Sequence, residues 1–402
     1  MDTIYDDTLT ASRAASRAAW SAILSMALCV AVLIASEFMP VSLLTPIAGD
    51  LGITEGRAGQ AISISGIFAV VTSLFIAGLT RRLDRKIVLA SFSILLVVSG
   101  AVVTFAPNYA VLMIGRALLG VAIGGFWSMS TAIVMRLVPE EAVPKGLAMI
   151  NAGNAIAATV SAPLGSLLGA YIGWRGAFFL VVPLALLALV WQWLSLPALP
   201  PRRTGSGNVF KLLLRSQVAL GMAAMFMFFM GQFALFTYLR PFLENVTGVS
   251  VSSLSAILLL MGLAGVAGTW VVGLLLRARL YSIVIAIPLA MTLLAVALIV
   301  WGAMPVATAA VLIGWGFFAT AAPVGWGTWL SRVLRDDAEA GGGLQVAVIQ
   351  FAITLGAAIG GLLFDAVGWW SPFAMAAVLL VGAALFAAAA AVDHQRGLRS
   401  LR

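Results

Sequence analysis

The sequence predicts an all-α membrane protein whose twelve transmembrane helices form two pseudo-symmetric six-helix bundles. The first reason is composition: 62% of the 402 residues are hydrophobic and 9% are charged, whereas soluble domains carry about 25% charged residues. The second reason is the number of apolar segments that are long enough to cross a membrane. The third is an internal repeat, because motifs of the first half return 195 residues later.

Twelve apolar segments have about the length of 20 helical residues that crosses a bilayer core of roughly 30 Å. We expect six of them near residues 20–46, 58–79, 87–106, 110–136, 146–171 and 177–196. We expect six more near residues 218–241, 253–276, 281–301, 306–330, 343–366 and 372–392. The first run is too long for the core of a signal peptide, so we interpret it as a retained helix.

Polar stretches between these segments set the expected domain boundaries. We expect a tail over 1–18, a bundle over 19–196, a linker over 197–217, a second bundle over 218–392 and a tail over 393–402. The linker contains Pro200, Pro201 and a Gly-Ser-Gly run, which are typical of loops. No stretch is hydrophilic and long enough to form a separate soluble domain.

The basic residues fall mainly on one side of the predicted membrane. Nineteen of the 23 Lys and Arg residues lie in segments on the side of the N-terminus, whereas Arg57, Arg175 and Arg240 lie in loops on the other side. Cytoplasmic loops are enriched in Lys and Arg, so we expect both termini in the cytoplasm. The net charge of +8 comes without an aromatic-basic run, so a lipid bilayer rather than a nucleic acid is the expected partner.

The repeat is clearest around an acidic residue. Glu37 lies nine residues before Pro46, and Gln232 lies nine residues before Pro241. A second region repeats with the same spacing of 195 residues, at 162–174 and 357–369. Two parallel six-helix halves that meet around a cavity near mid-membrane are typical of secondary transporters. The chain therefore carries two copies of one design, and the acid is present in the first copy alone.

Glu37 is the residue to which the sequence gives the greatest weight. A charge within a membrane span is costly and usually functional. Glu37 and Arg116 lie about 13 Å and 12 Å along their helices from the outer ends, at 1.5 Å per residue, so we expect the two side chains to pair. Burial disfavours a charged carboxyl group and a nearby guanidinium favours it, which suits the pair to binding and releasing a proton. The alternative is a static ion pair, or a glutamate capped by hydroxyl groups.

Catalytic chemistry and metal binding are not expected. Cys29 is the one cysteine and His394 the one histidine, so the chain has no intramolecular disulfide and no cluster of histidine ligands. An intramembrane enzyme would need a nucleophile–base pair or a metal cluster, and neither is visible. We therefore expect no cofactor. A sensor that binds a solute without moving it is a further alternative, but it would be expected to carry a long soluble signalling domain.

Polar and aromatic residues inside the spans are the candidates for binding a solute. They offer stacking surfaces, hydrogen-bond donors and acceptors, and they comprise Gln232, Thr237, Tyr238, Trp127, Asn151, Asn154, Trp315, Trp326, Gln345 and Gln350. Tryptophans also mark membrane interfaces, and we expect about half of the polar candidates to line a cavity. Asp365, near the end of its span, is expected at the outer interface rather than in a coupling site.

Small residues at four-residue spacing predict close contacts between helices. The pairs are Gly120 with Gly124 and Gly165 with Gly169. We expect them to pack, and to slide during alternating access. Pro163 lies beside the second pair, and its missing backbone donor should bend or weaken its helix.

Several of these motifs resemble those of the major facilitator superfamily. Residues 115–125 resemble the fourth-helix motif of its proton-coupled members, in which the arginine, here Arg116, assists coupling. Residues 162–169 resemble the motif of its drug:proton antiporters, with Ala162 and Ser166 in place of two glycines. The loop at 78–86 is similar to a degenerate form of the superfamily signature. Its usual acid is missing, and Asp84, beside Arg85, is in a position to replace it.

A closer resemblance is to the bacterial purine ribonucleoside efflux pumps. The segments that carry it start at Glu37, Gly124, Gly231, Pro323 and Gln345. This resemblance implies a monomer in the bacterial inner membrane that exports a purine ribonucleoside of the inosine or guanosine type. It implies that entering protons supply the energy by antiport. Export of a sugar or of drugs is the alternative within the superfamily.

Overall fold

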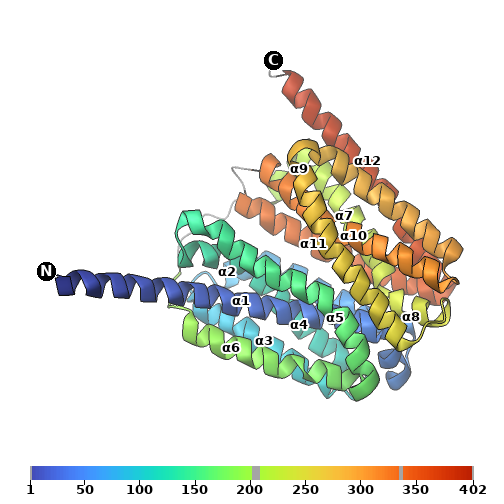
Figure 1. The fold of residues 1–402 in the computed structure, drawn as a ribbon, viewed down its shortest axis with the longest axis horizontal. Helices are drawn as coiled ribbons and strands as arrows, with labels where there is room; N and C mark the ends of the chain where they lie inside the picture. The colour runs from blue at the N-terminus through green and yellow to red at the C-terminus, as the bar shows by residue number, and fades with distance from the viewer. Residues whose placement is uncertain (1, 202–208, 335–337, 401–402) are drawn as a thin grey trace.

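The structure, a computed structural model, describes residues 2–201, 209–334 and 338–400, and these residues form helices and short connections without a strand (Figure 1). The N-terminal half contains six long helices: α1(Asp2–Leu51), α2(Glu55–Leu79), α3(Arg85–Thr104), α4(Tyr109–Leu137), α5(Val143–Phe179) and α6(Val181–Ser195). Residues of the expected types cap several of them. The side chains of Thr54, Asp84 and Asn108 accept hydrogen bonds from the first turns of α2, α3 and α4, as such residues commonly do.

The C-terminal half follows a short 3₁₀ helix, η2(Val209–Leu214). Its helices are α7(Ser216–Thr237), α8(Leu239–Asn245), α9(Val251–Trp301), α10(Pro305–Val333), α11(Ala338–Val367) and α12(Ser371–Ser400). The element α9 contains two membrane crossings, because its backbone leaves helical geometry at Arg279. Helix α5 is interrupted near its end, at Gly173 with φ of +73°, a conformation that glycine adopts readily.

The described residues contain eleven segments that are long and apolar enough to cross a membrane. One of them, Lys145–Ser195, is 51 residues long and joins α5 to α6 across the break at Gly173. Because that segment is long enough to cross twice, the described chain provides the twelve crossings that the sequence predicts. Large apolar side chains also point outward, including Leu293 and Val378, each 72% exposed, as expected of a surface that faces lipid.

The first helix differs in length from the prediction. We expected it near 20–46, whereas α1 runs from Asp2 to Leu51. The sequence has neither glycine nor proline before Pro40, so nothing local stops the helix from extending toward the N-terminus. Pro40 and Pro46 lie inside the helix, and transmembrane helices tolerate proline where neighbouring groups satisfy the freed carbonyls.

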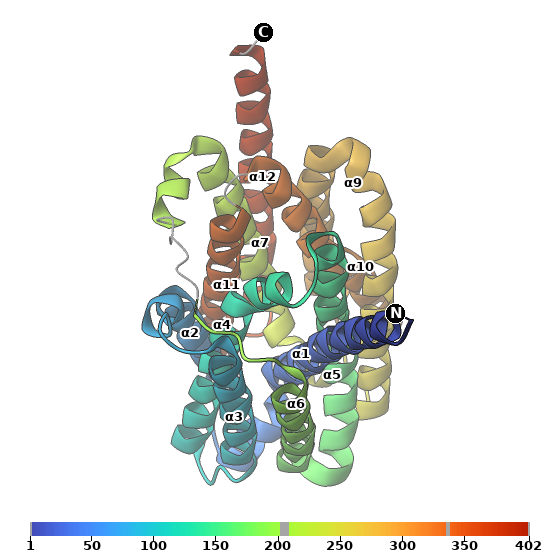
Figure 2. The same ribbon diagram turned by 90° about the vertical axis from the view of Figure 1, so that its left-hand side faces the viewer.

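The two halves lie side by side, with most helices of the N-terminal half below those of the C-terminal half in Figure 2. They meet where α2 packs against α11, α5 against α9, and α1 against α8. Each half has its own apolar core. Both ends of the chain project from the side of the molecule opposite α8 (Figure 1). We call the end that contains α8 the outer end, after the orientation that the basic residues predict.

Candidate functional site

The carboxyl group of Glu37 lies between the two halves. Glu37 is on α1 and is 2% exposed. Its Oε1 accepts a hydrogen bond from Nε2 of Gln350, on α11 of the other half, at 3.4 Å. The second amide atom, Oε1 of Gln350, is buried without a partner. The one acid deep within the described spans therefore contacts the opposite half through a single polar side chain.

Arg116 holds the main chain around Glu37. Arg116 is fully buried on α4. Its guanidinium donates to the carbonyl oxygens of Ser36 at 2.6 Å, Glu37 at 3.1 Å and Ala61 at 2.9 Å, and to the hydroxyl of Ser65 at 3.2 Å. It thereby links α4 to α1 and α2.

The expected ion pair between Glu37 and Arg116 is not formed. The physical reason lies three residues beyond Glu37. Pro40 has no N–H, so the carbonyl of Ser36 lacks the partner that an α-helix normally supplies four residues later. The guanidinium of Arg116 occupies that acceptor and the next carbonyl along the helix. The structure thus assigns Arg116 to the freed backbone rather than to the carboxylate.

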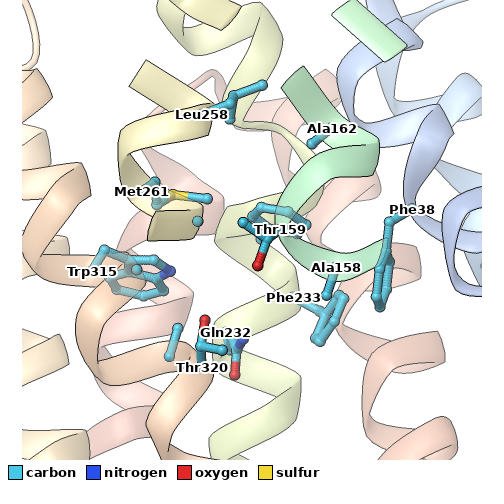
Figure 3. A pocket seen from close by; sticks show the side chains of 14 residues that line it. Phe38, Ala158, Thr159, Ala162, Gln232, Phe233, Leu258, Met261, Trp315 and Thr320 are labelled. Atoms are coloured by element: carbon cyan, nitrogen blue, oxygen red, sulfur yellow. The ribbon is translucent and has the colours of Figure 1, made fainter. Parts of the chain in front are cut away.

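A pocket opens between the two halves, and Phe38, the residue that follows Glu37, forms part of its wall (Figure 3). It encloses about 630 Å³ of empty space, a volume that includes space open to solvent. Its lining is mostly apolar and aromatic, and comprises Phe38, Ala158, Thr159, Ala162, Gln232, Phe233, Phe236, Leu258, Met261, Gly262, Trp315, Gly316, Ala319 and Thr320. Helices α1 and α5 supply the lining from the N-terminal half, and α7, α9 and α10 supply it from the C-terminal half.

Gln232 and Thr320 bring polar groups to this pocket (Figure 3). Oε1 of Gln232 is buried and has no hydrogen-bond partner. An unpaired buried acceptor carries a free-energy cost, and a bound solute with an N–H or O–H group would remove that cost. The rings of Phe38 and Phe233 stack on the pocket wall with their centroids 5.5 Å apart.

Of the ten residues considered for binding solute, Gln232 and Trp315 line this pocket and the other eight do not. Tyr238 is fully buried and donates its hydroxyl to the carbonyl of Ala357 at 2.8 Å. Thr237 is buried and donates to the carbonyl of Phe233 at 2.7 Å. Gln350 contacts Glu37 instead. Thr159 and Thr320 also line the pocket, but the sequence does not predict this, because their short side chains give little signal in an apolar helix.

The remaining candidates lie away from the pocket lining. Trp326 is buried and meets Trp329 edge to face at 6.0 Å. Trp127 is half-buried against the N-terminal core. Asn151 is exposed and donates to the carbonyl of Leu147. Asn154, on α5, and Gln345, on α11, are half-buried. Trp315, also considered from the sequence, does line the pocket.

The predicted packing glycines lie at close helix crossings. A Cβ atom at Gly120 or Gly124 would overlap the main chain of Ser65 or Ala69 on α2. A Cβ at Gly165 or Gly169 would meet side chains of α1, those of Ser42 and Leu43. Pro163 is buried inside α5, beside the second pair.

The loop between α2 and α3 contacts Leu199, in the segment that follows α6. Oδ1 of Asp84 accepts from the backbone N–H of Lys86 at 2.8 Å and of Leu199 at 3.0 Å. The N–H of Arg85 donates to the carbonyl of Leu199 at 2.9 Å, and its side chain donates to Thr80. These bonds fix the loop to Leu199, which belongs to the segment that leads from the N-terminal half to the C-terminal half.

Comparisons with known proteins agree with this architecture. Residues 26–341 match the Major Facilitator Superfamily. A solved bacterial homologue of the human lysosomal transporter Spinster, in an inward-facing and unoccupied conformation, superposes with a TM-score of 0.69 over 93% of this chain and 96% of its own. At 16% identity, this likeness concerns the fold alone.

Two curated relatives cover almost the whole chain. The transcription regulatory protein OpdE of Pseudomonas aeruginosa is 55% identical over 373 residues, which are 91% of this chain and 92% of the relative. The purine ribonucleoside efflux pump NepI of Salmonella paratyphi C is 45% identical over 375 residues, which are 93% of this chain and 94% of the relative. With its two helical halves and these matches, the chain belongs to the major facilitator superfamily of membrane transporters.

Proposed function

We propose that this protein exports purine ribonucleosides in exchange for protons across the bacterial inner membrane, with both termini in the cytoplasm. The observation that carries the proposal is the position of Glu37: a buried carboxyl group, bonded to the opposite half, one residue from a pocket-lining aromatic ring. The 45% identity to purine ribonucleoside efflux pumps over nearly the whole chain supports the solute class.

Coupling needs one group whose protonation depends on the arrangement of the two halves. A ligand shifts a two-state equilibrium by its differential affinity for the states. When the carboxyl group of Glu37 is charged, the hydrogen bond that it accepts from Gln350 is charge-assisted, and protonation removes that contribution. Protonation and separation of the halves at this depth are therefore linked, and linkage is reciprocal. Arg116, through Ser36 and Glu37, keeps the acid in place.

The pocket supports a solute with a flat ring and several hydrogen-bonding groups. Phe38, Phe233 and Trp315 provide aromatic surfaces, and the amide of Gln232 offers both a donor and an acceptor. A purine base presents adjacent donors and acceptors on its edge, and a ribose presents hydroxyl groups. A free sugar carries a hydroxyl group on most of its carbons, and the few polar groups of the pocket cannot bind all of them. The lining therefore favours a nucleoside over a sugar.

The test is counterflow in proteoliposomes that contain the purified protein. Radiolabelled inosine, arabinose and a cationic drug are each offered against an internal pool of the same compound. The proposal expects rapid exchange of inosine and background exchange of the other two. Exchange of arabinose or of the drug in place of inosine would replace the nucleoside by one of the alternative solutes.

The name of the 55% relative, a transcription regulatory protein, favours a second candidate, a membrane sensor for the same solute. A sensor would bind inosine in the pocket between the halves and would not move it. Equilibrium binding of inosine in detergent without exchange in proteoliposomes would establish the sensor. Exchange at many turnovers per protein establishes the transporter.

A further inference from the structure

Arg240 is buried between the two halves at the outer end of the molecule. The sequence predicts an outer loop here, but the chain turns at Tyr238 and forms the short helix α8 against α1. Arg240 is 7% exposed. Its Nη1 donates to the carbonyl of Ser42 on α1, and its Nε and Nη2 bind Oε1 of Glu244, each at 2.8 Å.

The carbonyl of Ser42 is available because of Pro46. Proline has no N–H, so the bond that residue 46 would make to the carbonyl four residues earlier is missing. The same rule explains Ser36, which Pro40 leaves free and Arg116 occupies. Helix α1 therefore presents two freed carbonyls to two buried arginines. Arg116 comes from the same half, and Arg240 comes from the opposite half.

A second polar contact joins the halves at the same end. Asp365 on α11 accepts from the hydroxyl of Thr54 at 2.6 Å and from the backbone N–H of Gly56 at 3.1 Å, both at the start of α2. Arg240 thus belongs to a region in which the outer ends of the two halves are held together by hydrogen bonds between side chains and helix ends.

We propose that Arg240 is a positioning residue of the transport cycle, whose bond to the Ser42 carbonyl holds the outer end of the protein closed. The inference rests on the proposed function, because alternating access requires the halves to separate at that end. Glu244 lies one turn after Arg240 on α8 and moves with it. The ion pair therefore survives opening and keeps the guanidinium directed and neutralised, whereas the bond to Ser42 breaks.

The experiment measures the distance between the outer ends of the two halves directly, with no solute added and no proton gradient applied. In a Cys29→Ser background, spin labels are attached at Gly49→Cys on α1 and Asn245→Cys on α8. Both positions are exposed, and a side chain at Gly49 meets no atom within 4 Å. Pulsed electron paramagnetic resonance then gives the distribution of distances between the labels for the parent and for Arg240→Gln, Pro46→Ala and Glu244→Gln.

Arg240→Gln removes the cation, and Pro46→Ala returns an N–H that competes for the Ser42 carbonyl. We expect both changes to raise the ratio of long to short distances by about tenfold, as loss of one charge-assisted hydrogen bond implies. Glu244→Gln leaves the Ser42 bond and should change the ratio much less. Unchanged distances in both Arg240→Gln and Pro46→Ala would overturn the proposal, as would an equal shift in Glu244→Gln.

Thermal unfolding of each variant establishes that the distances refer to folded protein. Arg240→Lys keeps the charge and provides a milder second variant. We expect its ratio of long to short distances to lie between those of the parent and of Arg240→Gln. The readout is independent of which solute is carried. Distances that shift in a protein without transport would leave the closing contact established and would refute only the proposed function.

Discussion

Phe38 and Phe233 stack against each other with ring centroids 5.5 Å apart, although each occupies the same position in its own half. The two residues are 195 positions apart, the spacing of the internal repeat. Equivalent residues of two related halves can touch each other only near the axis that relates those halves. Their neighbours, Glu37 and Gln232, therefore lie close to that axis, where the halves must separate in alternating access.

The first prediction concerns orientation. A reporter that is active only in the cytoplasm should function when fused after Arg215 or Arg399 and should fail after Gly248. The reason is the enrichment of Lys and Arg on the side of the termini. Reporter activity after Gly248 would contradict the predicted order of crossings.

The second prediction concerns the pocket. Gln232→Ala removes the amide that has an unpaired buried oxygen. We expect the apparent affinity for inosine to fall about tenfold, in line with the loss of one or two hydrogen bonds. The pH dependence of transport should stay the same, because glutamine does not titrate. Thr328→Ala, on α10 outside the pocket lining, serves as the control. An altered pH profile with unchanged affinity would show that the residue acts in coupling.

The third prediction concerns stability around Glu37. Arg116→Ala leaves the carbonyls of Ser36, Glu37 and Ala61 without their buried donor. We therefore expect the free energy of unfolding to fall by about 3 kcal/mol. Cys29 is the single cysteine and is 1% exposed, so a thiol-reactive dye reports unfolding without any added label.

Pro40→Ala provides the matching test of that account. It returns an N–H to the Ser36 carbonyl, so the cost of Arg116→Ala should be smaller in the Pro40→Ala background than in the wild type. Equal costs in the two backgrounds would show that the freed carbonyl contributes nothing to the role of Arg116.

The fourth prediction concerns helix packing. Gly124→Ala places a methyl group against the main chain of Ala69, which has little room to move, whereas Gly327→Ala meets no atom within 4 Å. We expect Gly124→Ala to lower the free energy of unfolding by about 1–3 kcal/mol. Gly327→Ala should be neutral or slightly stabilising. Similar unfolding temperatures for both variants would contradict the close approach of α4 to α2.

The sequence predicts the fold class, the number of crossings, and the burial of Glu37, because hydropathy and the internal repeat depend on composition and spacing. It predicts less well which side chains meet. Tyr238 and Gln232 are both polar residues of one span, yet Gln232 faces the pocket and Tyr238 packs on Phe364. The rotation of a helix about its axis decides this, and a helix that is apolar on every side carries no signal for its rotation.

The sequence prediction also gives no partner carbonyl for the buried arginines, although the prolines of α1 indicate where such carbonyls lie. Pairing Arg116 with the nearest acid follows charge alone, whereas in the structure Arg116 binds a carbonyl that Pro40 leaves free. A proline within a span marks such a carbonyl four residues earlier. Applied to Pro46, the same reading identifies Ser42, the residue that Arg240 binds.

The most direct test of the coupling role of Glu37 is the release of protons on addition of inosine to the purified protein in a weakly buffered detergent solution. Glu37→Gln keeps the size of the side chain and mimics the protonated carboxyl group, which has both a donor and an acceptor, but it cannot titrate. We expect the wild type to release protons in proportion to bound inosine, and Glu37→Gln to bind inosine without proton release. In proteoliposomes the variant should exchange inosine and fail to concentrate it. Proton release by Glu37→Gln together with uphill transport would contradict the account and place the coupling group elsewhere.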